Sequence, residues 1–328
     1  MKTKLIPAAL AALTLTAGIA EAGAADAGPA YPTKPVRFIV PFAPGGNTDI
    51  LSRLLGQKFA EAWGQQFIID NRPGAGGTVG TELAARSPAD GYTLVMGSFG
   101  SVIVARNLYP RLGYEPLRDL APVVLVSEPA GILVAHPAVA VKSVAELIAF
   151  AKSHPGKLNY GSPGAGTWNH LFVELFKQQA GVDFVHIPYK GVAPAVTDLL
   201  GGQVQLVLSA FPVAMPHVKA GKLRGLAVTS AKRSGLAPDI ATVSESGLPG
   251  YQAAGWFGVM VPAKTSPAIV AKLNREANRI LQLPEVRQSL AADGAEPAGG
   301  TPDAAAASAR TESARWSGLI KQLNLRLE

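Results

Sequence analysis

The chain has 328 residues, enough for two domains of about 150 residues each, and 48% of its residues are hydrophobic while 16% are charged. A chain of this composition buries a sizeable core, which excludes disorder as its main state. Cysteine is absent, so disulfides, cysteine-held metals and thiol nucleophiles are excluded. The net charge of +7 comes without a dense run of Lys or Arg, so we expect no nucleic-acid partner.

Residues 1–25 have the pattern of a secretory signal peptide. Lys2 and Lys4 make a basic start, residues 5–20 are apolar and Ala-rich, and residues 20–24 fit an A-x-A cleavage rule. The alternative is a membrane anchor, but this apolar stretch is short for a bilayer span of roughly 20 residues. We therefore expect export to the periplasm, a compartment without an ATP or NADH pool for a nucleotide-dependent enzyme.

After this leader, short apolar runs alternate with segments of helical periodicity. In chain order, the expected strands are 36–40, 67–69, 93–96, 158–160, 184–187, 204–208 and 226–228. Apolar side chains at helical spacing predict helices at 51–63, 143–151, 266–280 and 316–327, with further helical segments between the strands. This alternation predicts an α/β protein with mostly parallel sheets.

Three glycine-rich turns, at 41–49, 71–78 and 160–167, each follow a predicted strand and precede a predicted helix. Glycine lets the backbone approach a ligand closely, and a helix start offers unpaired N–H groups and the positive end of the helix dipole. Together these features favour a carboxylate or phosphate ligand. In an open sheet such turns lie at the carboxyl ends of strands, where ligands usually bind.

These turns have two other interpretations. The glycines alone would also make tight turns without any ligand. The spacing of Gly74, Gly76 and Gly80 is G-x-G-x-x-x-G, one residue off the dinucleotide fingerprint, and the chain has no P-loop motif. A nucleotide ligand is therefore not expected.

Several motifs, in order along the chain, closely resemble the Bug family, the TctC-like extracytoplasmic solute receptors of tripartite tricarboxylate transporters. The resemblance covers nearly the whole chain after the leader. Its motifs include Asn71-Arg72-Pro73-Gly74-Ala75-Gly76-Gly77, Asp90-Gly91-Tyr92-Thr93-Leu94, Tyr160-Gly161-Ser162-Pro163-Gly164-Ala165-Gly166-Thr167, Pro188-Tyr189-Lys190-Gly191 and Lys219-Ala220-Gly221-Lys222-Leu223-Arg224.

The resemblance implies a two-lobed periplasmic binding protein of the Venus-flytrap, type II-like kind, with two crossovers between its domains. Domain 1 would comprise 26–126 and 254–328, and domain 2 would comprise 127–253. A small organic carboxylate, or a close isostere, would lie in the cleft between them. The expected partners are this ligand and the membrane subunits of a tripartite tricarboxylate transporter, or a sensor kinase. We expect a monomer without enzymatic activity, cofactor or metal.

The resemblance also implies that backbone N–H groups and ordered water from two opposed loops hold the ligand. The expected ligand-binding residues are Phe42, Ala43, Gly45, Gly46, Asn47, Thr48, Ser98, Ser162, Pro163, Gly164, Ala165, Gly166, Thr167, His170, Tyr189 and Ser209. The residues expected to brace the loops are Asp49, Asn71, Arg72 and Gly76.

Several of these side chains have a structural alternative. Thr48 and Ser98 could each cap a helix instead of reaching the ligand. His170 could tie its loop together. Trp168 either walls the pocket or joins a core stripe with the apolar side chains that follow it. Lys190 either meets the ligand or stays solvated.

Two residues depart from the family pattern: Ala43 stands where proline is usual, and Gln205 stands where Asp is common. A periplasmic hydrolase is the alternative from another functional class. The five histidines form no H-E-x-x-H motif, and no G-x-S-x-G elbow occurs, although a triad assembled from distant residues leaves no such pattern.

Overall fold

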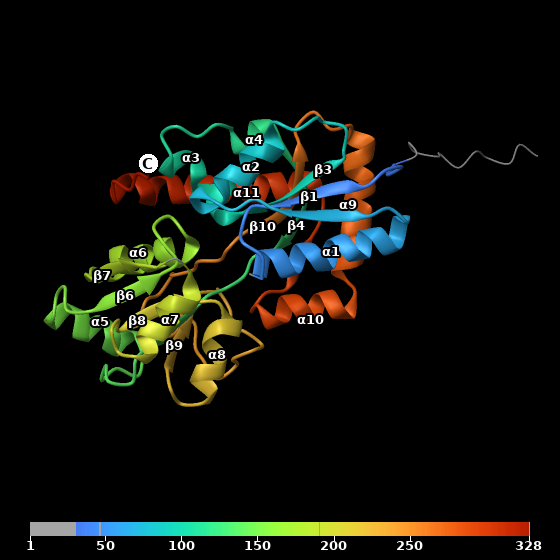
Figure 1. The fold of residues 1–328 in the computed structure, drawn as a ribbon. Helices are drawn as coiled ribbons and strands as arrows, with labels where there is room; N and C mark the ends of the chain where they lie inside the picture. Colours follow the sequence, from blue (N-terminus) through green and yellow to red (C-terminus); the bar gives the residue numbers. More distant parts are fainter. Residues whose placement is uncertain (1–30, 46, 190, 328) are drawn as a thin grey trace, which may run out of the picture.

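The computed structural model describes residues 31–45, 47–189 and 191–327. The predicted signal peptide, Gly46 and Lys190 lie outside these residues, so the structure does not test the expectations for them. Figure 1 shows two lobes, each built around its own sheet and connected by segments that cross between them. Within the described residues, none of the helices combines the length and the apolar character that a bilayer span requires.

The first lobe contains a six-stranded sheet in the order β11-β4-β10-β3-β1-β2. Its strands β1, β3 and β4 are almost wholly buried because helices cover both faces, which explains their near-continuous apolar sequences. The strands are β1 (Val36–Val40), β2 (Phe67–Asn71), β3 (Thr93–Ser98), β4 (Leu120–Ser127), β10 (Phe257–Pro262) and β11 (Pro297–Gly299).

The second lobe contains a five-stranded sheet in the order β7-β6-β8-β5-β9. Its strands are β5 (Ile132–Ala135), β6 (Asn159–Ser162), β7 (Val185–Pro188), β8 (Leu206–Ser209) and β9 (Arg224–Val228). The chain leaves the first sheet after β4, builds the whole second sheet and returns at β10. The two crossing segments are residues 128–131 and 229–256.

Helices follow most strands and surround both sheets (Figure 1). Those of the first lobe are α1 (Asn47–Trp63), η1 (Ala75–Gly77), α2 (Thr78–Ala85), η2 (Phe99–Val104), α3 (Ala105–Leu108), α4 (Pro116–Asp119), α9 (Pro267–Leu281), α10 (Pro284–Ala292) and α11 (Pro302–Gln322). Those of the second lobe are α5 (Val144–Ser153), α6 (Trp168–Ala180), α7 (Val192–Leu200) and α8 (Phe211–Lys219).

The two-lobed α/β fold is the expected one, but its sheets are mixed rather than mostly parallel. Three strands in each sheet are parallel: β1, β2 and β3 in the first, β6, β7 and β8 in the second. Strands β10 and β5, which follow the crossing segments, run antiparallel to their neighbours, because the chain enters each sheet from the edge facing the other lobe. The sequence analysis did not identify β4, β5, β10 or β11, and it placed the other strands within about two residues.

Aromatic packing joins the lobes beside the crossing segments. Phe172 of α6 stacks on Trp316 of α11 with ring centroids 5.2 Å apart, and its edge-on contact with Phe99 of η2 has a centroid distance of 5.4 Å. All three side chains are almost completely buried. The core therefore continues from one lobe into the other through Phe172.

Replacing Phe172 by Ala should lower the free energy of unfolding by about 3–5 kcal/mol, because a buried ring would leave a cavity between α6 and α11. Ile68→Ala on the edge strand β2 is the control: this side chain is 52% exposed, so the loss should stay within about 0.5 kcal/mol. Equilibrium urea unfolding measures both, and equal losses for the two variants would contradict the assignment.

Candidate functional site

Strand pairing brings the ends of three parallel strands of the first sheet to the edge that faces the second lobe. The first residue of β10, Phe257, pairs with Ser98 at the end of β3 and with Ser127 at the end of β4. Strands β1 and β2 run parallel to β3, so they end at the same edge. Both crossing segments leave from this edge.

The second sheet repeats this arrangement. Ile132, the first residue of β5, pairs with Ser209 at the end of β8 and with Val228 at the end of β9. Strands β6 and β7 are parallel to β8 and end at the same edge. The segment from Ser127 to Ile132 can span at most about 18 Å, so the carboxyl ends of both parallel triplets face each other at short range.

The first loop joins β1 to α1, and Asp49 in the first turn of α1 holds it. The carboxylate accepts hydrogen bonds from the Gly45 N–H and from the Arg53 guanidinium, both at 2.9 Å. It also accepts one from the Asn71 amide at 2.9 Å, and the same amide donates to the Phe42 carbonyl at 3.0 Å. Asp49 is 3% exposed, so the loop is fixed from inside the protein.

These bonds keep Asp49 ionised. Burial raises the pKa of the Asp49 carboxyl, but the hydrogen bonds from Arg53, Gly45 and Asn71 outweigh it and hold the pKa below its ordinary value. The charge is neutralised by Arg53. A carboxylate can thus shape this loop while the N–H groups that begin α1 remain suited to an anion.

The second glycine-rich turn, between β2 and α2, supports the first. The Arg72 N–H donates to the Val40 carbonyl at 2.8 Å, whereas the Arg72 side chain pairs with Asp70 and not with the first loop. Gly76 has a φ of 63°, which favours glycine, and its carbonyl lies against Gly100 of η2.

The opposed loop joins β6 to α6, and its hydroxyl groups bond within the loop. Thr167 caps α6: its hydroxyl accepts from the His170 N–H and donates to the Gly164 carbonyl at 2.7 Å. The Ser162 hydroxyl accepts from the Gly164 N–H at 3.1 Å and lies 2.6 Å from His186 Nε2. The sequence predicts that Ser162 and Thr167 bind the ligand, and in this structure both hydroxyl groups hold the turn.

The same bonds narrow the choice of main-chain donors. The N–H groups of Gly164, Gly166 and Thr167 have partners within the loop, and Pro163 has no N–H to offer. In the part of the chain that the structure describes, the N–H groups of Ala165, Trp168 and Asn169 donate to no such internal partner. Trp168 and Asn169 open α6, where unpaired N–H groups gather, and Ala165 lies in the loop before it.

His170 ties this loop to α6. Its Nδ1 accepts a hydrogen bond from the Gly166 N–H at 3.2 Å, and its ring lies 4.3 Å from that of His186. The side chain is 4% exposed. Burial and the neighbouring His186 lower the pKa of His170 to about 4, so the ring is neutral at pH 7 and its Nδ1 remains an acceptor.

The remaining predicted site residues lie at the two facing edges. Ser98 caps η2 through Ser101, which is its structural alternative. Thr48 lies inside the first turn of α1, which begins at Asn47, so it is not the cap that the sequence suggested. Tyr189 follows β7 and donates to Asp198 at 2.8 Å, and buried Ser209 ends β8. Ala43 is exposed on the first loop.

Trp168 packs against the core, and Gln205 lies at the far edge of its sheet. Trp168 is half-buried and packs against Phe172 and close to Gly131 in the first crossing segment, so it joins the core beside the crossover. Gln205 precedes β8 and bonds to the N–H of Asn159 at the start of β6. It therefore lies at the sheet edge opposite the glycine-rich loops, away from the facing edges.

Leu108 and Leu327 of the first lobe touch the loop of the second. A Cβ placed on Gly166, which has a φ of +78°, would lie 2.6 Å from Leu327 Cδ1 and 2.9 Å from Leu108 Cδ1. The Leu327 N–H donates to the Leu108 carbonyl at 2.8 Å, which fixes the segment after α11 at this place. The sequence analysis missed these contacts and also His186, because none of these residues belongs to a glycine-rich motif.

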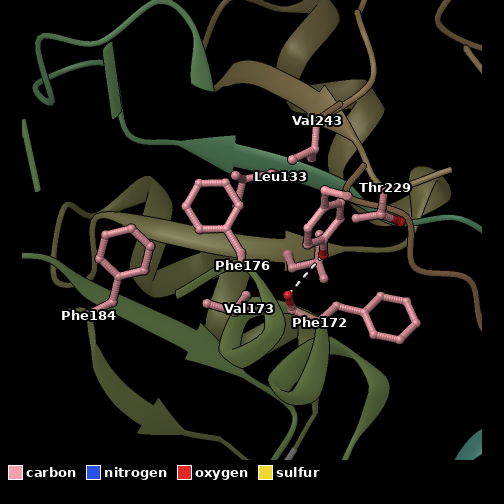
Figure 2. A pocket seen from close by; sticks show the side chains of 9 residues that line it. Leu133, Phe172, Val173, Phe176, Phe184, Thr229 and Val243 are labelled. Atoms are coloured by element: carbon pink, nitrogen blue, oxygen red, sulfur yellow. Dashed lines mark hydrogen bonds between the residues drawn. The ribbon is translucent and has the colours of Figure 1, made fainter. Parts of the chain in front are cut away.

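Two other hollows lie away from these loops. One, of about 10 Å³, is enclosed in the second lobe between α6 and the sheet, and barely holds one water molecule (Figure 2). There the Tyr251 hydroxyl donates to the Phe172 carbonyl at 2.9 Å. The other, of about 330 Å³, lies on the first lobe between α11 and the segment from η2 to α4. Among the described residues, no group of three His, Asp or Glu side chains is placed to hold a metal ion.

Comparison with known proteins matches residues 51–325 to the family described as "Tripartite tricarboxylate transporter family receptor". "Protein BugT" of Bordetella pertussis is 40% identical over 95% of this chain and 95% of its own length. "UPF0065 protein in tcbD-tcbE intergenic region" of a Pseudomonas species is 36% identical over 96% of this chain and 93% of its own.

Solved structures agree with this match. "R. palustris Rpa4515 with adipate" has a TM-score of 0.83 and 38% identity, covering 90% of this chain and all of that one. "MatC (Rpa3494) from Rhodopseudomonas palustris with bound malate" has a TM-score of 0.79 and 33% identity over 88% of this chain and all of that one. "Structure of periplasmic binding protein BugD" has a TM-score of 0.80 and 33% identity, over 90% of this chain and all of that one. With TM-scores of 0.79 to 0.83, these structures share the fold of this chain.

Gly166→Ala tests the contact between the lobes. Gly181→Ala is the matched control, because Gly181 also has a positive φ of 62° but nothing lies within 4 Å of its added Cβ. Gly166→Ala should lose about 1–3 kcal/mol more unfolding free energy than the control, owing to the clash with Leu327 and Leu108. Adding Leu327→Ala should recover part of that difference. Equal losses for the two single variants in urea unfolding would refute the contact.

His170 makes stability depend on pH. Its pKa falls from 6.5 in the unfolded chain to about 4 in the folded protein. Between these pH values the unfolded state binds a proton at His170 and the folded state does not. This contribution is complete above about pH 6.5 and is lost as the pH falls toward 4. The free energy of unfolding, measured by urea titration at several pH values, should drop less steeply across this window in His170→Asn. Identical slopes in the two proteins would contradict the assignment.

Proposed function

This chain belongs to the receptor family of tripartite tricarboxylate transporters, and on that premise we propose that it captures a small organic carboxylate, or a close isostere, between its lobes. It then delivers this ligand to the membrane subunits of a transporter. One observation carries the proposal: two glycine-rich loops, each opening a helix, end parallel strands at the two edges that face each other.

Main-chain groups hold the anion in this proposal. Helix α1 begins at Asn47 and α6 at Trp168, so each facing loop leads into unpaired N–H groups and the positive end of a helix dipole. From the second lobe the donors are the N–H groups of Ala165, Trp168 and Asn169. In this proposal Asp49 and Ser162 shape the loops and do not contact the charged group of the ligand.

The binding of acids by relatives supports the ligand class. The two Rhodopseudomonas palustris structures hold adipate and malate, both dicarboxylates. Main-chain donors recognise a carboxylate group but carry little information on the rest of the molecule. We therefore propose the class of small organic acids, with dicarboxylates as the first ligands to test.

We also propose that the protein acts in the periplasm as a monomer, after removal of residues 1–25, and performs no chemistry on its ligand. The family and the periplasmic binding protein BugD among its structural neighbours support this location. Delivery to a membrane sensor, rather than to a transporter, would use the same cleft.

A ligand panel tests the proposal directly. Adipate, malate, aromatic acids and neutral diamides of the same length are each added to the protein during unfolding. An acid at 100-fold its dissociation constant should stabilise the folded protein by about 2.7 kcal/mol. Stabilisation by an acid but not by its diamide would assign the contact to the carboxylate. No stabilisation by any compound, together with turnover of an ester panel, would overturn the receptor in favour of a hydrolase.

A further inference from the structure

A histidine that no glycine-rich motif contains lies beneath the loop of the second lobe. His186 on β7 is next to β6 in the sheet, opposite Tyr160 in the pairing register. Its Nε2 reaches past this position to the Ser162 hydroxyl at the end of β6, 2.6 Å away. The Ser162 side chain is completely buried, so water does not compete for this bond.

The Ser162 hydroxyl is the centre of the turn. It accepts a hydrogen bond from the Gly164 N–H at 3.1 Å, and the Gly164 carbonyl lies 3.2 Å from it. A hydroxyl has one proton and two lone pairs, and the Gly164 N–H occupies one of the lone pairs. The remaining lone pair and the proton of the hydroxyl face the His186 ring and the Gly164 carbonyl. The imidazole therefore determines how this hydroxyl is oriented.

Packing holds the His186 ring in place. It stacks on Tyr160 at 4.8 Å and lies 4.3 Å from His170, which itself binds the Gly166 N–H. Helix α6 presents Glu174 and Lys177 to this cluster: Glu174 accepts from the Tyr160 hydroxyl at 2.6 Å and from Lys177 at 2.9 Å.

The charges around the ring favour its neutral form. Burial lowers the pKa of His186, the Lys177 charge lowers it further, and Glu174 partly opposes them. A neutral ring can accept the Ser162 proton or donate its own, whereas a cation can only donate. Each histidine thus fixes one glycine of the loop: His186 acts on Gly164 through Ser162, and His170 acts on Gly166 directly.

We propose that His186 is a positioning residue for ligand binding: through the Ser162 hydroxyl it fixes the Gly164 turn so that the N–H groups at the start of α6 point into the cleft. This inference rests on the proposed function, because it assigns His186 to the loop that grips the carboxylate. His186 acts through Ser162 and does not itself contact the ligand.

Two substitutions distinguish the effect of the hydrogen bond from the effect of ring packing. His186→Phe keeps an aromatic ring against Tyr160 and His170 but cannot bond to Ser162. His186→Gln loses the ring but places an amide near the position of Nε2. Affinity is measured by calorimetry for adipate, or for the panel acid that stabilises the protein most. His186→Phe should weaken binding about tenfold, and His186→Gln should stay within about threefold of the parent.

A double-mutant cycle identifies the route. Ser162→Ala should weaken binding at least as much as His186→Phe, because it removes the bond to His186 and the Gly164 bond together. The double variant should bind no more weakly than Ser162→Ala. Hydrogen exchange of the Gly164 amide in the ligand-free protein provides a readout that needs no ligand. Exchange should speed up most in Ser162→Ala, which deletes the acceptor of this N–H, should also speed up in His186→Phe, and should stay close to the parent rate in His186→Gln.

Binding by His186→Phe equal to that of the parent, or additive losses in the double variant, would overturn the inference. Unchanged exchange at Gly164 would overturn it as well. If the parent binds none of the acids, the proposed function fails, while the exchange comparison still decides whether His186 holds the turn.

Discussion

The site depends on one constraint, the place where the chain crosses between the lobes. Phe257 pairs with the ends of β3 and β4, and Ile132 pairs with the ends of β8 and β9. The crossing segments therefore begin where the parallel strands of both sheets end. This pairing brings two loops that are about 120 residues apart in the sequence to facing edges. Helix dipoles and N–H groups from both lobes can then act on one small ligand.

The two loops are held by different chemistry. In the first, the ionised Asp49 is neutralised by Arg53 and receives three hydrogen bonds. In the second, the neutral groups of Ser162, Thr167 and the two histidines perform the same task. Both arrangements occupy some N–H groups of their loops, and in the proposed site the N–H groups that open each helix bind the ligand. Preorganised main-chain donors lose little conformational entropy on binding.

The sequence predicted those features of the fold that a local sequence pattern determines. The parallel strands and the glycine-rich turns were found because burial on both faces gives apolar runs and tight turns need glycine. Strand β4 was missed: Pro122 interrupts it, and only the register shift opposite Met260 of β10 accommodates that proline. His186 was missed because its role comes from a neighbouring strand, which sequence spacing does not reveal. Thr48 was expected as a cap but lies within the first turn of α1, because helix boundaries are the least predictable part of a helix.

The contacts between the lobes bear on how a ligand would be held. Phe172 packs on Trp316 beside the crossing segments, and Leu327 packs on Gly166 at the loop itself. A ligand shifts the balance between open and closed lobes only by the contacts that it makes in one state and not in the other. If Gly166 separates from Leu327 when the lobes open, part of the free energy of closure is already supplied by apolar packing. The carboxylate then needs to add only a few hydrogen bonds, which is consistent with the proposed capture by main-chain donors.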